Sequence, residues 1–223
     1  MQQEKEYLKE EIRKEFQLER MILFSDAVFA IVITLMVIEI HVPEFQKTIT
    51  TDEFMHQMIQ LLPNLVAYMA SFAFIGITWY QHLQLFSLLK DYDKGLVIRN
   101  LLLLFFIGLF PFSAALVARP SNGLFPVIVI YFMMVILCRT TQLALQHYIL
   151  VQRPHLRVHA DIKDELIRYK KSRVIVISLF VMFMLTSITM SLITDPNMKQ
   201  YAWCWFFPFP LVLRFFKSRI KAA

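Results

Sequence analysis

Residues 20–42 read R-M-I-L-F-S-D-A-V-F-A-I-V-I-T-L-M-V-I-E-I-H-V, and they are apolar over a length that suits a lipid bilayer. At about 1.5 Å per residue, a helix over this stretch spans roughly 30 Å, the hydrocarbon thickness of a membrane. Asp26 stands near the start of this helix, where a buried acid is costly unless it is paired or wetted. The sequence alone therefore leaves two interpretations of Asp26: a functional group, or a cap near the membrane interface.

The composition extends this picture to the whole chain of 223 residues, of which 57% are hydrophobic and 18% charged. Typical soluble domains carry about 25% charged residues, so the composition predicts an all-α membrane protein that crosses the bilayer several times. No phosphate-binding loop or zinc-protease motif occurs, and Cys138 and Cys204 stand singly in apolar runs. We therefore expect no enzyme activity, no cofactor and no metal site.

Hydrophobic runs predict six membrane helices within one transmembrane domain at 21–218, with boundaries good to a few residues. A charged, amphipathic lead-in at 1–20 is expected to be a cytosolic helix that lies on the membrane or packs against other subunits. A short tail, 219–223, follows the last helix. The six expected helices are 21–42, 56–80, 96–118, 124–150, 173–194 and 200–216.

The basic residues predict the orientation of these helices. Of the 23 Lys and Arg residues, all but Lys47, Arg119 and Lys199 lie on one side of the expected membrane. By the positive-inside rule, both termini are then cytoplasmic. This distribution explains the net charge of +6 by membrane topology, so we expect no nucleic acid as a partner.

The first helix carries the pattern R-x-x-x-F-S-D-x-x-x-A, made by Arg20, Phe24, Ser25, Asp26 and Ala30. This pattern resembles the signature of the first membrane helix in the transmembrane protein 175 family, potassium channels of endolysosomes and bacteria. The resemblance implies a homotetramer around a four-fold axis, because the chain has one copy of the motif. It also implies a prokaryotic plasma-membrane protein that conducts K⁺, a monovalent cation, passively across the lipid bilayer.

One stripe of the first helix is uniformly apolar: at 100° per residue it holds Phe24, Val28, Ile31, Leu35, Ile38 and Val42, with Thr34 at its edge. By itself such a stripe is typical of a packing face. The resemblance implies instead that first helices line the pore, with Ile31 at the constriction and Leu35 and Ile38 further out. Thr34 would offer a hydroxyl to a hydrated ion. No T-V-G-Y-G filter occurs, so side chains would select the ion.

Polar residues on two other helices are expected to meet the motif. Arg20 and Asp26 point in directions that differ by about 120°, so each needs a partner on a neighbouring helix. Trp79, His82 and Asn100 lie at the matching depth. The resemblance implies that they complete a hydrogen-bonded network that holds the pore helix. The alternative for Trp79 and His82 is anchoring at the membrane interface.

Two other classes of function remain open from the sequence. A proton-coupled transporter of a cation would use Asp26, Glu39 or His82 as titrating groups. A membrane scaffold that conducts nothing would have the same helices. The sequence favours a potassium-selective cation channel with a hydrophobic ring as gate and filter.

Overall fold

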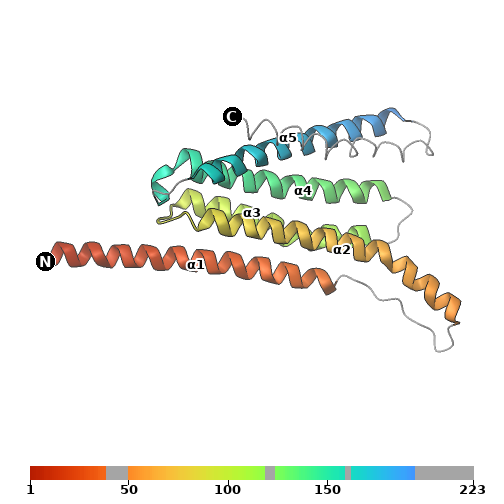
Figure 1. Ribbon diagram of the computed structural model, residues 1–223, viewed down its shortest axis with the longest axis horizontal. Helices are drawn as coiled ribbons and strands as arrows, with labels where there is room; N and C mark the ends of the chain where they lie inside the picture. Colours follow the sequence, from red (N-terminus) through yellow and green to blue (C-terminus); the bar gives the residue numbers. More distant parts are fainter. Residues whose placement is uncertain (39–49, 119–123, 159–161, 194–223) are drawn as a thin grey trace.

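The structure is a computed structural model that describes residues 1–38, 50–118, 124–158 and 162–193. These residues form five α-helices that lie side by side (Figure 1), with no strand beyond one bridged pair, Leu89 and Arg157. The helices are α1 (Gln2–Ile38), α2 (Thr51–Phe86), α3 (Lys94–Ala118), α4 (Leu124–His147) and α5 (Lys163–Leu192). A π-helical turn, Tyr148–Gln152, and a 3₁₀ turn, Pro154–Leu156, follow α4. The expectation of an all-α chain is confirmed for the described residues.

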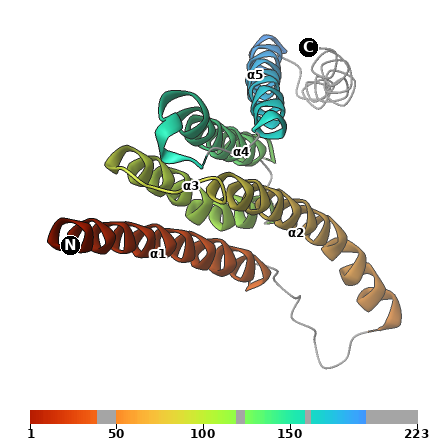
Figure 2. The ribbon, with the colours of Figure 1, turned by 60° about the vertical axis from the view of Figure 1, so that its left-hand side comes forward.

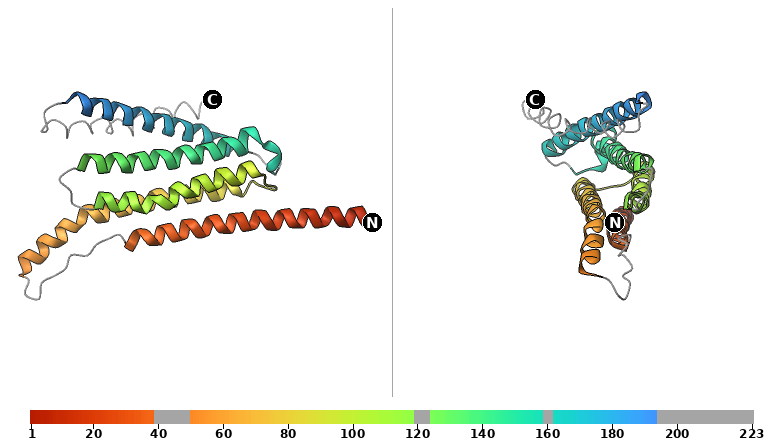
Figure 3. Two further views of the ribbon diagram at one scale, coloured as in Figure 1. Left: turned by 180° about the vertical axis from the view of Figure 1, so that it is seen from behind. Right: turned by 90° about the vertical axis from the view of Figure 1, so that its right-hand side faces the viewer.

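Helix α1 joins the charged lead-in and the first apolar run in one helix of 37 residues. No break occurs at residue 20, and the N-terminal end extends past the other helices (Figure 3). A straight helix that crosses a bilayer cannot also lie flat on its surface. The continuity of α1 therefore disfavours a lead-in that lies on the membrane.

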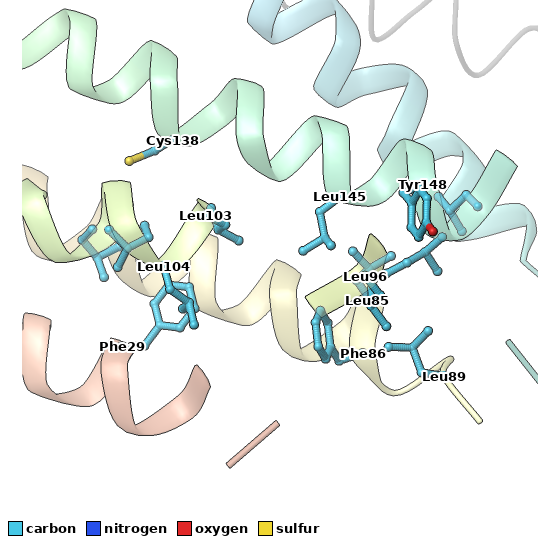
Figure 4. Close-up of a cluster of buried hydrophobic side chains, with 14 of the residues drawn as sticks. Phe29, Leu85, Phe86, Leu89, Leu96, Leu103, Leu104, Cys138, Leu145 and Tyr148 are labelled. Carbon is cyan, nitrogen blue, oxygen red and sulfur yellow. The ribbon is translucent and has the colours of Figure 1, made fainter. Parts of the chain in front are cut away.

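Helix α3 is the centre of the packing, because it contacts α1, α2 and α4, while α5 packs mainly on α4 (Figure 2). The core is a cluster of buried side chains from these helices (Figure 4). Phe29 of α1 and Leu104 of α3 belong to it, as do Cys138 and Leu145 of α4. The buried position of Cys138 agrees with its interpretation as a packing residue.

Four of the described helices are long and apolar enough to cross a membrane by length and composition: α1, α3, α4 with its π-helical extension, and α5. Helix α2 is 36 residues long but is not among these four. The sixth expected helix, 200–216, lies outside the described residues. The described part of the chain thus supports a multi-pass membrane protein, and the count of six crossings stays a prediction.

Four helices, α1, α2, α3 and α5, are longer than the hydrophobic runs that predicted them, whereas α4 ends three residues before the end of its run. Helix α2 begins at Thr51 because Thr50 forms a capping box with Glu53: the Glu53 N–H donates to Thr50 Oγ1, and Thr50 N–H donates to Glu53 Oε2 at 3.0 Å. Helix α5 begins at Lys163, with Asp164 and Glu165 in its first turn. Acids at that end are favourable to the helix dipole. Polar turns of this kind carry no hydrophobic signal.

The connections α2–α3 and α4–α5 meet at one end of the bundle, which we call the connecting end. Tyr148 of the π-helical turn donates its hydroxyl to Asp93 at 2.6 Å, and the Arg99 guanidinium lies over the Tyr148 ring at 4.0 Å. A Cβ on Gly95 would come within 2.2 Å of the Tyr148 hydroxyl oxygen, so only glycine allows this close approach. The backbone N–H of Lys90 and that of Asp91 also donate to the Leu156 carbonyl.

Candidate functional site

A chain of hydrogen bonds joins three helices around the motif of α1. His82 Nε2 of α2 lies 2.9 Å from Asn100 Oδ1 of α3, and Asn100 Nδ2 lies 2.8 Å from Ser25 Oγ of α1. Ser25 Oγ is in turn 2.8 Å from the carbonyl oxygen of Met21. In this arrangement His82 donates to Asn100, Asn100 donates to Ser25, and Ser25 donates to the backbone, while His82 Nδ1 has no hydrogen-bond partner among the described residues. The direction of these hydrogen bonds places the proton of a neutral His82 on Nε2.

The three side chains that form these hydrogen bonds are fully buried. Ser25 is 0% exposed, and His82 and Asn100 are each 1% exposed. The His82 ring stacks on Phe86 with 3.9 Å between centroids and lies 5.5 Å from the ring of Phe29. Polar groups that are buried between helices favour one register, because any other register leaves them without partners. These hydrogen bonds therefore fix how α1 packs against α2 and α3.

Asp26 has a separate partner. Trp79 Nε1 of α2 donates to Asp26 Oδ1 at 2.9 Å, and both side chains are partly exposed. The carboxylate next to Ser25 is thus tied to the same helix that supplies His82. The structure brings together five of the eight residues proposed for the motif network: Ser25, Asp26, Trp79, His82 and Asn100.

The other three residues of that proposed network lie apart from it. Arg20 is exposed, and its guanidinium lies 5.9 Å from the ring centroid of Phe16 on the same helix, not against a neighbouring helix. Phe24 is exposed. Ala30 is exposed too, and its carbonyl accepts a bond from Thr34 Oγ1 at 3.1 Å. Their side chains are thus not part of the hydrogen bonds that join α1 to α2 and α3.

Helix α1 buries one face and leaves another open. The residues on its buried face between Ser25 and the end of the helix are Ser25, Phe29, Val32 and Met36. The residues proposed to line a pore are exposed instead: Ile31 is 57% exposed, and Leu35, Ile38 and Thr34 are exposed as well. At 100° per residue, the row Ile31–Leu35–Ile38 points about 130° away from the buried face. Among the residues of the predicted stripe that the structure describes, Val28 is the exception, because it packs partly against the core; Val42 lies outside the described residues.

Thr34 combines a polar group with this open apolar row. Its hydroxyl donates to a backbone carbonyl of its own helix, that of Ile31 at 2.8 Å or of Ala30 at 3.1 Å. A hydroxyl that donates inward presents its oxygen lone pairs outward. An exposed Thr34 oxygen can therefore accept from water or contact a cation.

Reasoning from the sequence missed the aromatic packing of His82 and one polar bridge. Phe29 and Phe86 stand four residues after Ser25 and His82, so helical spacing could have pointed to them. The bridge runs from Arg139 of α4, which donates to Gln81 of α2 at 3.0 Å. Arg139 had been interpreted only as a topological charge. Glu39, considered above as a titrating group, lies outside the described residues.

The helices and the buried hydrogen bonds between them define the chain as a multi-pass helical membrane protein. The model of the family described as "Endosomal/lysosomal potassium channel TMEM175" matches residues 20–111, which include the motif and its partners. The chain resembles a lysosomal potassium-selective channel TMEM175 homolog from Chamaesiphon minutus in its solved structure: the TM-score is 0.68, the identity 25%, and the coverage 92% of this chain and 98% of that one. Residues 20–111 are therefore similar to the TMEM175 family, and most of the chain shares the fold of that solved channel.

Two relatives show how far the sequence similarity reaches. A potassium channel of Chamaesiphon minutus is 41% identical over 96 residues, which cover 43% of this chain and 47% of that protein. A protein of Gallus gallus named an endosomal/lysosomal proton channel is 34% identical over 120 residues, which cover 51% of this chain and 23% of that protein. The chain thus spans about half the length, or less, of the relatives that it matches, and the similarity is concentrated in its first half.

Proposed function

We propose that the protein is a potassium-selective cation channel. The observation that carries the proposal is the open row of Ile31, Leu35 and Ile38 on α1, set apart from the face by which the helix packs into its own subunit. An apolar row that does not pack within its own chain can line a narrow pore when several chains assemble around it. The relatives support the ion, because two of those named above are a potassium channel and a potassium-selective channel.

The proposed assembly is a homotetramer with six membrane helices in each subunit and both termini in the cytoplasm of a prokaryotic cell. One chain supplies one α1, so a closed pore lined by first helices needs several chains. The hydrogen bonds from His82 to Ser25 hold α1 by its buried face, so its exposed face is available to line the pore. Arg20, Phe24 and Ala30 are free to contact the neighbouring subunits.

The proposed mechanism is gating and selection by a ring of Ile31 side chains. An apolar constriction resists wetting, and an ion that passes it must lose part of its hydration shell. K⁺ holds its water less tightly than Na⁺ does, so such a ring favours K⁺. The Thr34 oxygen, less than one helical turn away, would accept the partly hydrated ion. Leu35 and Ile38 would extend the apolar wall.

The test is ion flux from liposomes that hold the purified protein, under a potassium gradient and then a sodium gradient. We expect fast, uncoupled potassium flux that exceeds sodium flux. Ile31→Asn should raise the sodium flux relative to potassium, because a polar ring wets the constriction. Ile177→Asn is the matched control: Ile177 is 58% exposed on α5, and its substitution should leave the ion ratio unchanged.

Each alternative has its own outcome in the same experiment. Flux that needs an imposed proton gradient would indicate a coupled transporter, with Asp26 and His82 as the first residues to substitute. Proton flux without potassium flux would match the name of the animal relatives rather than that of the bacterial ones. An unchanged ion ratio in Ile31→Asn would remove Ile31 as the filter, and the absence of any flux would indicate a scaffold.

A further inference from the structure

A cavity of about 350 Å³ opens between α2, α4 and α5, away from the hydrogen bonds around α1. Its size is at the lower end of the range for ligand pockets, about 300 to 1,000 Å³. Gln84 of α2 and Arg168 of α5 line it, and each stands within two turns of the end of its helix at the connecting end. The cavity therefore lies near the end of the bundle that carries the connections.

The charges around this cavity have one sign. Arg139, Arg168 and Lys171 line it, and no Asp or Glu is among its lining residues in the described part of the chain. Arg168 is paired with Glu165. Arg139 instead donates to the neutral Gln81, and its guanidinium lies over the Phe74 ring at 4.8 Å. Two positive charges, those of Arg139 and Lys171, are thus left without a carboxylate partner among the described residues.

A buried amide in the same wall also lacks partners. Gln142 lines the cavity one turn after Arg139 and is 2% exposed, yet neither its amide nitrogen nor its amide oxygen has a hydrogen-bond partner. An enclosed amide without partners costs about 1–3 kcal/mol. A bound group that accepts hydrogen bonds would relieve this cost on the nitrogen and would neutralise Arg139.

The far wall of the cavity is apolar. Ile77 stands one turn from Gln81 on α2, toward the middle of the helix, and Ile175 and Val176 stand one turn from Lys171 on α5. The cavity is therefore basic near the connecting end and hydrocarbon-like toward the middle of the bundle. A lipid with an anionic head group has the same division along its length.

We infer that this cavity binds a phosphate group, supplied by an anionic phospholipid. The phosphate oxygens accept from Arg139, Lys171 and the Gln142 amide nitrogen, and the acyl chain follows Ile77 and Val176. Basic pockets between membrane helices commonly hold anionic head groups. The inference needs only the subunit fold and does not depend on conduction or on the ion that passes.

The experiment uses the full-length protein in a neutral detergent. Native mass spectrometry and thermal unfolding compare three probes: dioleoyl-phosphatidylglycerol, dioleoyl-phosphatidylcholine and inorganic phosphate. We expect phosphatidylglycerol to bind more tightly than phosphatidylcholine and to raise the unfolding temperature. Loss of one charge-assisted contact should weaken binding of phosphatidylglycerol about tenfold in Arg139→Gln and somewhat less in Lys171→Gln. Arg139→Lys, which keeps the charge, should retain part of the affinity.

Lys170→Gln is the control, because Lys170 is exposed on the same helix, carries the same charge and does not line the cavity. It should bind phosphatidylglycerol as the unsubstituted protein does. Lys171 is also exposed, so its variant tests the site even if Arg139→Gln folds poorly. Equal binding of the two lipids, or equal losses in Lys170→Gln and Lys171→Gln, would overturn the inference. Inorganic phosphate that binds as tightly as phosphatidylglycerol, with the same dependence on Arg139 and Lys171, would support the phosphate site and make free phosphate its ligand.

Discussion

The two faces of α1 have almost the same chemistry and opposite surroundings. Phe29, Val32 and Met36 are buried in the core, whereas Phe24, Ile31 and Leu35 are exposed. Hydrophobicity cannot tell the two rows apart, since each consists of large apolar side chains. What separates them is Ser25, which is held by Asn100 and so fixes the rotation of the helix. One polar contact thus decides which apolar row packs into the core and which stays exposed.

The largest effect should come from a pair of phenylalanines that lie on the two faces. Phe29→Ala removes a ring that is 1% exposed, and we expect it to lower the free energy of unfolding by about 3–5 kcal/mol. Phe24→Ala removes the same ring from the open face, and we expect the free energy of unfolding to fall by less than about 1 kcal/mol. Thermal unfolding in detergent measures both. Equal losses would mean that the two faces are not separated as described.

The next effect should come from the hydrogen bonds that set the rotation. Asn100→Leu leaves His82 Nε2 and Ser25 without their buried partner, and we expect a loss of about 1–3 kcal/mol in the free energy of unfolding. Thr140→Ala is a control, because the Thr140 hydroxyl is exposed and bonds only to the Ile136 carbonyl of its own helix. If the two variants unfold at the same temperature, the chain of hydrogen bonds does not hold α1.

A smaller effect on the free energy of unfolding is expected from Asp93, which lies in the connection between α2 and α3. Partial burial of Asp93 opposes its ionisation. The hydrogen bonds from the Tyr148 hydroxyl and the Leu96 N–H, with the nearby charges of Arg153 and His155, outweigh this burial and lower the pKa of Asp93. A lowered pKa stabilises the folded state above the ordinary value of about 3.9, and this stability is lost as the pH falls through the folded-state pKa.

The corresponding variant is Asp93→Asn. It should lower the free energy of unfolding at pH 7 by about 1 kcal/mol, because the variant keeps an acceptor for the Leu96 N–H but loses the charge that strengthens the hydrogen bond from Tyr148 and attracts Arg153. The loss should shrink when unfolding is measured at pH 3. A loss that is the same at both pH values would show that the charge of Asp93 contributes nothing.

The smallest effect should come from the N-terminal part of the same face of α1. Lys14 Nζ lies 3.8 Å from Asp91 Oδ2, and both side chains are partly open to water. Such pairs contribute about 0.2–1 kcal/mol and weaken with salt. Lys14→Gln should therefore change the unfolding temperature slightly at low salt and not at 1 M salt. A large loss would mean that α1 is held from outside the membrane as much as from within.

Much of this arrangement could be predicted from the sequence, because membrane helices have a strong signal. The hydrophobic runs located the described helices, and the depth of Trp79, His82 and Asn100 along the chain placed them level with Ser25 and Asp26. The face that α1 buries could not be predicted, since both faces are apolar. The π-helical turn at Tyr148 carried no signal either. Arg139 was counted as a charge that orients the helices, and only the packing of α4 on α2 revealed its contact with Gln81.

The continuity of α1 has a mechanical consequence. Gln2 and Ile38 belong to one rod with no hinge between them, so the helix transmits torsion along its length. A molecule that binds residues 2–16 contacts the same continuous helix that carries Ile31. A twist applied there turns Ile31 through a similar angle, and the bond from Asn100 to Ser25 is the restraint against which that twist works.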